Sequence, residues 1–266
     1  MGVSPPYLFD TGPSEVAVRS EFDADITLMS LHGPWSLALA TTVSVALRKC
    51  FSEHPRGLLL DLTGLDDESG RSGPAWVTAY RRGAGMDPPV PVAVCAPEEG
   101  ALTANLRRSG ALRYLPLYAR AEAAEQALMR GRPLTDRIEM RLDRDAETPA
   151  RARKLAQNAC DAWGREDLAY PVQIVVSELV SNVLEHTATD GRLLMSRRGR
   201  GLHLAVEDHS RVMPRPGAGM RGRGGAKLAE GGRGLQIVHE ASSAWGAMPT
   251  TDGKVVWAII REDFTG

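Results

Sequence analysis

The sequence predicts a two-domain protein in which an α/β layered domain precedes an α+β sandwich. Buried strand patterns alternate with helical patterns up to about Met129, Gly and Pro break this rhythm at residues 131–136, and helices followed by consecutive strands come afterwards. The length of 266 residues exceeds that of most single domains, which cluster at roughly 100 to 150 residues. We therefore expect domains at residues 1–130 and 137–266, joined by a linker at 131–136.

Strand and helix patterns alternate in the first half of the chain. Residues 25–32, D-I-T-L-M-S-L-H, are apolar on both sides, as in a buried strand. Apolar residues then repeat at helical spacing over residues 36–50. Two more strands are expected at residues 57–62 and 89–95, and further helices at 74–82, 98–108 and 121–129. Strands separated by helices indicate an α/β layer with at least part of its sheet parallel.

The second half has a different order. A strand is predicted at residues 137–142, then helices over 148–163 and from Tyr170, each with a proline in its first turn. A strand pair, a helix and a last strand complete the pattern, at residues 192–198, 201–208, 235–242 and 254–261. A long Gly/Arg-rich segment at 210–232 separates the strand pair from the last helix. This segregation of helices and antiparallel strands indicates an α+β sandwich.

Composition excludes several classes of protein. The chain is 43% apolar and 24% charged, with net charge −1 and pI near 6.6, so it has no general attraction for nucleic acid or anionic membranes. Its three cysteines are odd in number and far apart, which fits neither a disulfide framework nor a zinc site. The N-terminus lacks a signal-peptide pattern, and no apolar run reaches the ~18 residues of a membrane span. We expect a cytoplasmic protein.

The segment S-E-L-V-S-N-V-L-E-H-T, residues 177–187, places Glu178 and Asn182 at the flank of an apolar helix stripe. The stripe explains how the helix packs. The pair has two interpretations: it forms the solvent-exposed side of an amphipathic helix, or it faces a charged ligand. The pair alone favours the first, so the choice depends on the rest of the chain.

Three later motifs bear on that choice. The strand L-H-L-A-V-E-D ends in Asp208, where a sheet can deliver a carboxylate into a cleft, although turn formation also explains it. The segment E-G-G-R-G-L-Q-I-V, residues 230–238, opens a helix with three glycines, which favours phosphate binding at the helix N-terminus or marks a flexible loop. The segment D-G-K-V-V-W, residues 252–257, carries a Gly-Lys at a hairpin turn.

The order and spacing of these motifs resemble the Bergerat-type ATP-binding fold of histidine kinases, gyrase and Hsp90-like chaperones. The resemblance covers roughly residues 135–261, and the combination of S-E-L-V-S-N-V-L-E-H with E-G-G-R-G-L is most similar to the anti-sigma-factor serine kinases and related ATP-binding regulators. It implies ATP and Mg²⁺ as cofactors. No phosphoacceptor histidine box precedes this region, which argues against a conventional histidine kinase.

The resemblance also implies roles for individual residues. Asn182 would coordinate Mg²⁺ bridging the phosphates, Asp208 would accept a hydrogen bond from the adenine amino group, and Glu178 would be the general base. The remaining nucleotide-binding residues would be His186, Gly232, Arg233, Gly234, Leu235 and Lys254. The sequence departs from the family at Asp208-His209-Ser210, where the family often has Asp-x-Gly.

Competing nucleotide and nucleic-acid motifs do not fit. The segment G-A-G-M-R-G, residues 217–222, matches G-x-G-x-x-G but follows prolines rather than a strand, so it is not a Rossmann site. The sequence contains no P-loop motif. The arginines and lysines of residues 211–233 lack interleaved aromatics that would stack on bases, and a cationic lid over a triphosphate explains them better.

The first half of the chain resembles the STAS domain of anti-sigma-factor antagonists. The resemblance rests on strand order and on D-L-T-G-L-D-D-E-S-G-R-S-G at residues 61–73, which is similar to the D-L-S-G and Asp-Ser-Ser-Gly elements of that family in a degraded form. In the family, one serine of the second element receives phosphate. Here Ser69 or Ser72 would be the acceptor, or the segment acts only as a helix N-cap.

Both resemblances together imply an anti-sigma-type regulator with protein-serine kinase activity that controls transcription through partner switching. The expected partners are a STAS-type antagonist, a sigma factor, the N-terminal domain in cis, and a second copy in a homodimer, with no nucleic acid and no membrane. The alternative is a nucleotide-gated binding module without phosphotransfer. A structural α/β protein without ligand is the third interpretation.

Overall fold

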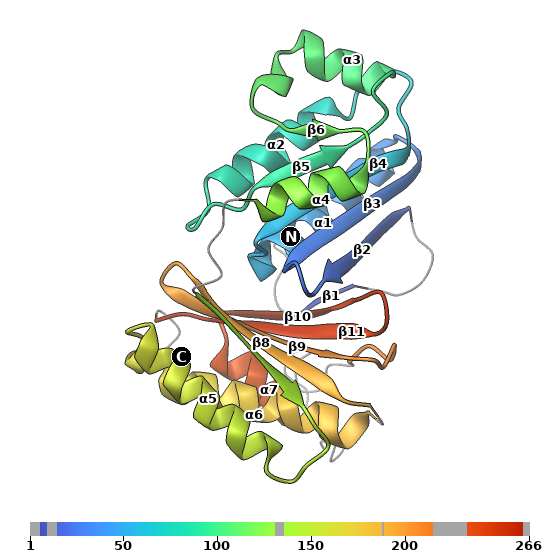
Figure 1. Ribbon diagram of the computed structural model, residues 1–266. Helices are drawn as coiled ribbons and strands as arrows, with labels where there is room; N and C mark the ends of the chain where they lie inside the picture. The colour runs from blue at the N-terminus through green and yellow to red at the C-terminus, as the bar shows by residue number, and fades with distance from the viewer. Residues whose placement is uncertain (1–5, 10–14, 131–135, 188, 215–232, 263–266) are drawn as a thin grey trace, which may run out of the picture. The chain divides into compact units, whose positions relative to one another are not determined.

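The computed structural model describes residues 6–9, 15–130, 136–187, 189–214 and 233–262 (Figure 1). The chain divides into two compact units, which we treat separately. The N-terminal unit comprises Thr11–Arg132, and the C-terminal unit comprises Met1–Asp10 together with Pro133–Gly266. The described helices include none that is both long and apolar enough to cross a membrane.

A mixed sheet with strand order β2-β3-β4-β5-β6 forms the centre of the N-terminal unit. Strand β2 is antiparallel to β3, and all other neighbours are parallel. The strands are β2 (Val16–Glu21), β3 (Ile26–Pro34), β4 (Gly57–Asp66), β5 (Val92–Cys95) and β6 (Leu117–Tyr118). The helices are α1 (Leu37–Glu53), α2 (Gly73–Ala84), α3 (Ala101–Arg108), the 3₁₀ turn η1 (Ala111–Arg113) and α4 (Ala121–Met129).

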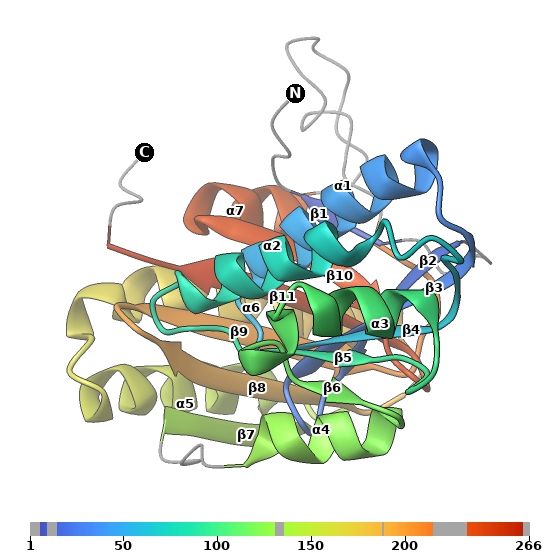
Figure 2. The same cartoon turned by 90° about the horizontal axis from the view of Figure 1, so that it is seen from above.

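Helices cover both faces of this sheet (Figure 2). On one face, Ile26 and Leu28 of β3 pack in a buried cluster with Ala124 and Leu128 of α4. The other face carries the alternate residues of β3, where Thr27 Oγ1 donates a hydrogen bond of 2.7 Å to Glu53 Oε2 of α1. The prediction of an α/β layer is therefore confirmed. The predicted burial on both sides holds for Ile26 to Leu31, where Ser30 is half-buried, but His32 is exposed.

A second mixed sheet with strand order β1-β10-β11-β9-β8-β7 forms the C-terminal unit. Its neighbours are antiparallel except β1 and β10, which are parallel. The strands are β1 (Tyr7–Leu8), β7 (Arg137–Leu142), β8 (Gly191–Arg198), β9 (Gly201–Asp208), β10 (Ala244–Pro249) and β11 (Lys254–Ile260). The helices are α5 (Thr148–Ala162), the 3₁₀ turn η3 (Glu166–Leu168), α6 (Ala169–His186) and α7 (Arg233–Ala241).

Strand β1 crosses the predicted domain boundary. The sequence assigns residues 1–130 to one domain, yet Tyr7 and Leu8 pair with Gly246 and Ala247 of β10 in the sheet of the other unit. Phe9 N donates a hydrogen bond of 3.0 Å to the carbonyl of Ala247, and this extends the pairing. The short strand pairs with a strand far along the chain, and no local sequence pattern reveals such a partner. Of the predicted linker at 131–136, residues 131–135 lie outside the described part of the chain.

One face of the C-terminal sheet packs against α5, α6 and α7 (Figure 1). The predicted stripe on α6 is buried, and its members are Val172, Val175, Val176, Leu179, Val180 and Val183. These valines and leucines contact the alternate residues of β8 and β9, such as Met195 and Leu204, in a single buried cluster. Since side chains of a strand alternate between faces, this packing also decides which strand residues face α6.

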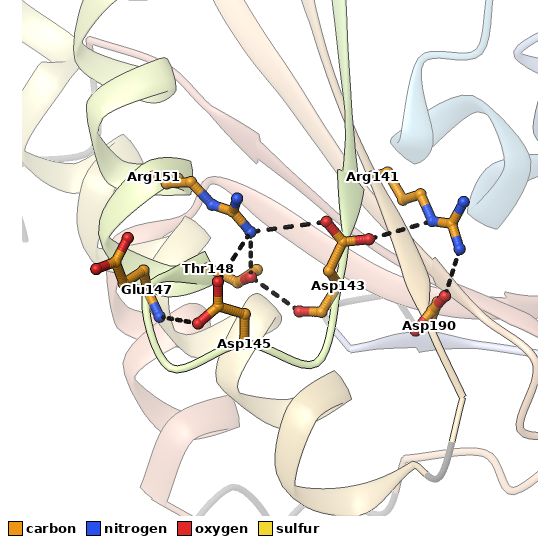
Figure 3. Close-up of polar contacts among 7 residues, drawn as sticks. All are labelled: Arg141, Asp143, Asp145, Glu147, Thr148, Arg151 and Asp190. Carbon is orange, nitrogen blue, oxygen red and sulfur yellow. Dashed lines mark hydrogen bonds and ion pairs between the residues drawn. The ribbon is translucent and has the colours of Figure 1, made fainter.

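A group of ion pairs connects the end of β7 with the start of α5 (Figure 3). The Arg141 guanidinium lies 3.2 Å from Asp143 and 2.6 Å from Asp190, just before β8. The Arg151 guanidinium lies 3.7 Å from Asp143, and the Thr148 hydroxyl donates a 2.8 Å hydrogen bond to the Asp143 carbonyl. These pairs are exposed, so each adds little stability.

Candidate functional site

A cavity of about 300 Å³ opens between the helix-covered face of the C-terminal sheet and helices α6 and α7. Side chains from α6, β9, β11 and α7 line it. The polar lining residues are Asn182, His186, Asp208, Ser210 and Lys254. The apolar lining residues are Leu179, Val183, Val206, Val212, Met213, Pro214, Leu235 and Val256. A mostly apolar cavity with a few convergent polar groups is the usual form of a small-molecule site.

Helix α6 delivers two polar side chains to the cavity region from the flank of its buried stripe. Asn182 lines the cavity directly. Glu178 lies one turn earlier, and its Oε2 atom would be 2.7 Å from a Cβ placed on Gly234 of α7. Asn182 Oδ1 would be 3.6 Å from the same position. Glu178, Asn182 and the first turn of α7 therefore meet at one point.

The environment of Glu178 suits a proton acceptor. Partial burial raises the pKa of its carboxyl above the ordinary value, and the neighbouring charge of Glu185 adds to the rise. A carboxylate with a raised pKa is a stronger base near neutral pH than an ordinary glutamate.

Asp208 ends β9 and faces the cavity. Its Oδ1 atom accepts a hydrogen bond of 2.7 Å from the backbone N–H of Ser210 and one of 2.8 Å from Lys254 Nζ. Asp208 therefore both restrains the turn after β9 and lines the cavity, so the two interpretations of this residue hold together. Ser210 occupies the place of the glycine in Asp-x-Gly, and its backbone N–H restrains the carboxylate.

The hairpin between β10 and β11 places Lys254 beside Asp208. Lys254 is the register partner of Asp208 across β9 and β11, so both side chains project from the same face of the sheet. The preceding Gly253 is needed because a Cβ there would collide with the carbonyl oxygen of Asp208. The prediction that Gly253-Lys254 lies at a hairpin is confirmed, with Lys254 as the first residue of β11.

The structure brings most of the predicted site residues together. Asn182, His186, Asp208, Leu235 and Lys254 line the cavity, with His186 exposed at the last position of α6. Glu178 and Gly234 adjoin Asn182. Arg233 begins α7 with an exposed side chain. Gly232 lies outside the described residues, as do residues 215–231 of the predicted lid.

Apart from Leu235, sequence reasoning missed the apolar lining of the cavity, and it missed the contacts of Asp208. Strand alternation could have revealed the cavity-facing residues of β9 and β11. Val206 lies two residues before Asp208, and Val256 lies two residues after Lys254, so each valine faces the same side of the sheet as its polar neighbour. The ion pair of Lys254 with Asp208 depends on the register between two strands and has no local signal. Within the described ranges, no group of three or more His, Cys, Asp or Glu side chains could hold a metal ion.

A second polar cluster lies in the N-terminal unit, in the loop before α2. Asp67 accepts hydrogen bonds from the backbone N–H groups of Ser72 (2.8 Å) and Arg71 (3.0 Å) and from the Ser69 hydroxyl (3.2 Å). Desolvation opposes ionisation of Asp67, but these hydrogen bonds outweigh it and hold its pKa below the ordinary value. The buried Ser72 hydroxyl accepts a 2.9 Å hydrogen bond from Trp76 Nε1, whereas Ser69 is exposed.

Part of the C-terminal unit is similar to a known family of domains. Residues 142–260 match the family model of the histidine kinase-like ATPase domain. Among solved structures, an anti-sigma factor antagonist from Mycobacterium paratuberculosis is similar, with 16% sequence identity and a TM-score of 0.36, over 47% of this chain and 98% of that chain. A search of curated proteins found no match.

Proposed function

We propose that this protein is an ATP-binding regulator of the anti-sigma-factor type, which phosphorylates a serine of a STAS-type antagonist and thereby controls transcription through partner switching. One observation carries the proposal: the Asn182 amide, the Asp208 carboxylate and the Lys254 ammonium, from three separate elements, line one cavity. The match of residues 142–260 to the histidine kinase-like ATPase domain supports a nucleotide as its ligand.

The residues of the cavity fit Mg²⁺–ATP. The Asn182 side chain offers a hard oxygen of the kind that Mg²⁺ accepts alongside phosphate oxygens and water. This oxygen lies near the first turn of α7, where backbone N–H groups favour anions. Bound Mg²⁺ would neutralise charge on the phosphates. The apolar walls, including Val206 and Leu235, suit a purine ring.

Glu178 acts as the general base in this proposal. The serine oxygen of the antagonist attacks the γ-phosphorus of ATP, the bond from that phosphorus to the oxygen bridging to the β-phosphate breaks, and ADP leaves. The serine proton passes to a Glu178 carboxylate oxygen. Gly234 leaves room for this carboxylate beside Asn182, because a side chain there would contact Glu178 Oε2. Most of the rate enhancement would come from positioning and charge neutralisation, as in other phosphoryl transfers.

The N-terminal unit is proposed to regulate the ATP domain in cis by controlling access of a separate partner. It is joined to the C-terminal unit at both ends, next to β1 and before β7. A test must keep β1, so residues 11–132 are replaced by a Gly/Ser linker. The six-stranded sheet separates β1 from β7 by about 24 Å, five strand spacings of ~4.8 Å, which a flexible linker of roughly 20 residues spans. Unchanged ATP affinity and partner binding would refute regulation in cis.

Radiolabelled ATP and a panel of STAS proteins test the kinase itself. Label transfer is expected to at least one of them, and Glu178→Gln should lower it by about 100-fold or more while leaving ADP affinity within about 3-fold. Glu240→Gln is the matched control, because it removes an exposed carboxylate of α7 that does not contribute to the pKa shift of Glu178. ATP binding without label transfer would refute the kinase and support the alternative function, a nucleotide-gated binding module. Absence of any thermal shift with Mg²⁺–ATP would leave a structural protein.

A further inference from the structure

We infer that Lys254 reads the purine base together with Asp208: Lys254 Nζ donates a hydrogen bond to ring nitrogen N1 while Asp208 accepts one from the exocyclic amine. The inference rests on the proposed nucleotide function and assigns Lys254 a specific contact within it. Lys254 would then determine specificity for the base, rather than only attract the phosphates by its charge.

The position of the pair is the first reason. Lys254 Nζ lies 2.8 Å from Asp208 Oδ1, with only 10% and 4% of the two side chains exposed. Burying two charges is costly, so such a pair needs a function or extra hydrogen bonds to persist. This pair lines the wall of a cavity rather than the hydrophobic core. Its charged groups are therefore available to a ligand in that cavity.

The hydrogen-bonding capacity of both groups is the second reason. Asp208 Oδ1 already accepts two hydrogen bonds, from Lys254 and from the backbone N–H of Ser210. The residues of the described segments give Oδ2 no partner, so this oxygen can accept from a ligand. The Lys254 ammonium has three N–H groups. One binds Asp208 and one points to the Ser210 carbonyl at 3.4 Å, which leaves the third for a ligand.

The order of acceptor and donor matches adenine. The Watson–Crick edge of adenine presents an amine donor beside the N1 acceptor. Asp208 Oδ2 and Lys254 Nζ, side by side on adjacent strands, present an acceptor beside a donor. Guanine presents a carbonyl acceptor beside an N1–H donor, the reverse order. A guanine base in the same orientation would face two mismatched contacts, which is a strong basis for rejection.

Deletion of single ligand atoms tests the contact. Calorimetry with Mg²⁺ measures binding of ADP and of 1-deaza-ADP, in which N1 is replaced by C–H, to the full-length protein. The wild type should bind 1-deaza-ADP about tenfold more weakly, as expected for loss of a hydrogen bond from a charged donor. Lys254→Met should bind the two ligands within about twofold of each other. Lys154→Met, which removes an exposed lysine of α5, should keep the tenfold ratio.

The outcomes separate this inference from the proposed function. Equal binding of ADP and 1-deaza-ADP by the wild type overturns the contact and leaves ATP binding intact, as does an unchanged tenfold ratio in Lys254→Met. No ADP binding by the wild type overturns the nucleotide function and the inference together. If Lys254→Met fails to fold because Asp208 is left without its countercharge, the double variant with Asp208→Asn replaces it. The tenfold ratio must disappear there too.

Discussion

The Glu178 carboxylate on α6 lies against Gly234 on α7, so close that a Cβ at position 234 would be 2.7 Å from Glu178 Oε2. The atom in the way is the far end of a flexible side chain. A larger residue at 234 would therefore displace the carboxylate rather than unfold the helix. The proposed phosphotransfer should therefore require glycine at position 234, although glycine has no reactive group of its own.

Gly234→Ala should lower label transfer to the proposed STAS substrate by about 10- to 100-fold, because a displacement of about 1 Å at a reacting group costs that much. ADP affinity should stay within about 3-fold. Initial rates with radiolabelled ATP and calorimetry with ADP measure the two effects. Gly100→Ala is the control, since a Cβ there meets no atom within 4 Å. Equal rates for Gly234→Ala and wild type would contradict this relationship.

Phosphotransfer should depend on pH through Glu178. Burial, and then the charge of Glu185, raise the pKa of Glu178 above 4.5. A general base acts in its ionised form, so the rate should rise with pH through this raised pKa and level off above it. Glu185→Gln removes one cause of the rise and should move the acid limb of the profile to lower pH. If the acid limb of the pH–rate profile vanishes in Glu178→Gln but keeps its position in Glu185→Gln, the Glu185 charge does not affect the pKa of Glu178.

Ser69, rather than Ser72, should be the labelled residue if the N-terminal unit accepts phosphate. Ser69 is exposed, whereas the Ser72 hydroxyl is buried beneath the Trp76 indole that donates to it. Ser72→Ala should cost about 1–3 kcal/mol of unfolding free energy, because the buried indole N–H loses its acceptor. Ser69→Ala should be nearly neutral but abolish label in this unit. Mass spectrometry of labelled peptides and chemical denaturation measure the two effects.

Asp67 should stabilise the N-terminal unit in a pH-dependent way. Its pKa is lowered from 3.8, so its contribution is present above the unfolded value and lost as pH falls through the folded value. Asp67→Asn should destabilise the unit by about 1–3 kcal/mol at pH near 7 and by much less in acid. Hydrogen exchange of peptides from α2 reports this unit specifically. A mutant effect of the same size at both pH values would contradict the role of the charge.

Tyr7 should stabilise the C-terminal unit although it lies far from the other strands of that unit in the sequence. Its ring stacks on Trp257 of β11, with centroids 6.1 Å apart and planes 5° from parallel. Tyr7→Ala should lower the free energy of unfolding by about 3 kcal/mol, as for other large aromatic truncations. Tyr170→Ala, at a residue that is 76% exposed, should change it by less than about 0.5 kcal/mol. Thermal unfolding followed by tryptophan fluorescence measures both.

Elements with a clear periodic pattern could be predicted from the sequence, and elements that depend on distant partners could not. The predicted strands at 137–142 and 201–208 coincide with β7 and β9. Strand β10, A-W-G-A-M-P, contains a glycine and a proline that are typical of turns, and its strand conformation comes from pairing with β11. The site followed the same rule: Glu178 and Asn182 are neighbours on one helix, but Lys254 meets Asp208 only through strand register.

The pairing of β1 with β10 affects the order in which the protein can fold during its synthesis. The described strands of the N-terminal unit lie between Val16 and Tyr118, so that sheet can form while the ribosome is still translating the rest. Strand β1 leaves the ribosome before the other strands of its sheet, and its partner β10 is complete only when Pro249 has emerged. At about 5–20 residues per second this wait lasts about 10–50 s. During it, Tyr7 and Leu8 are open to chaperones and to wrong partners.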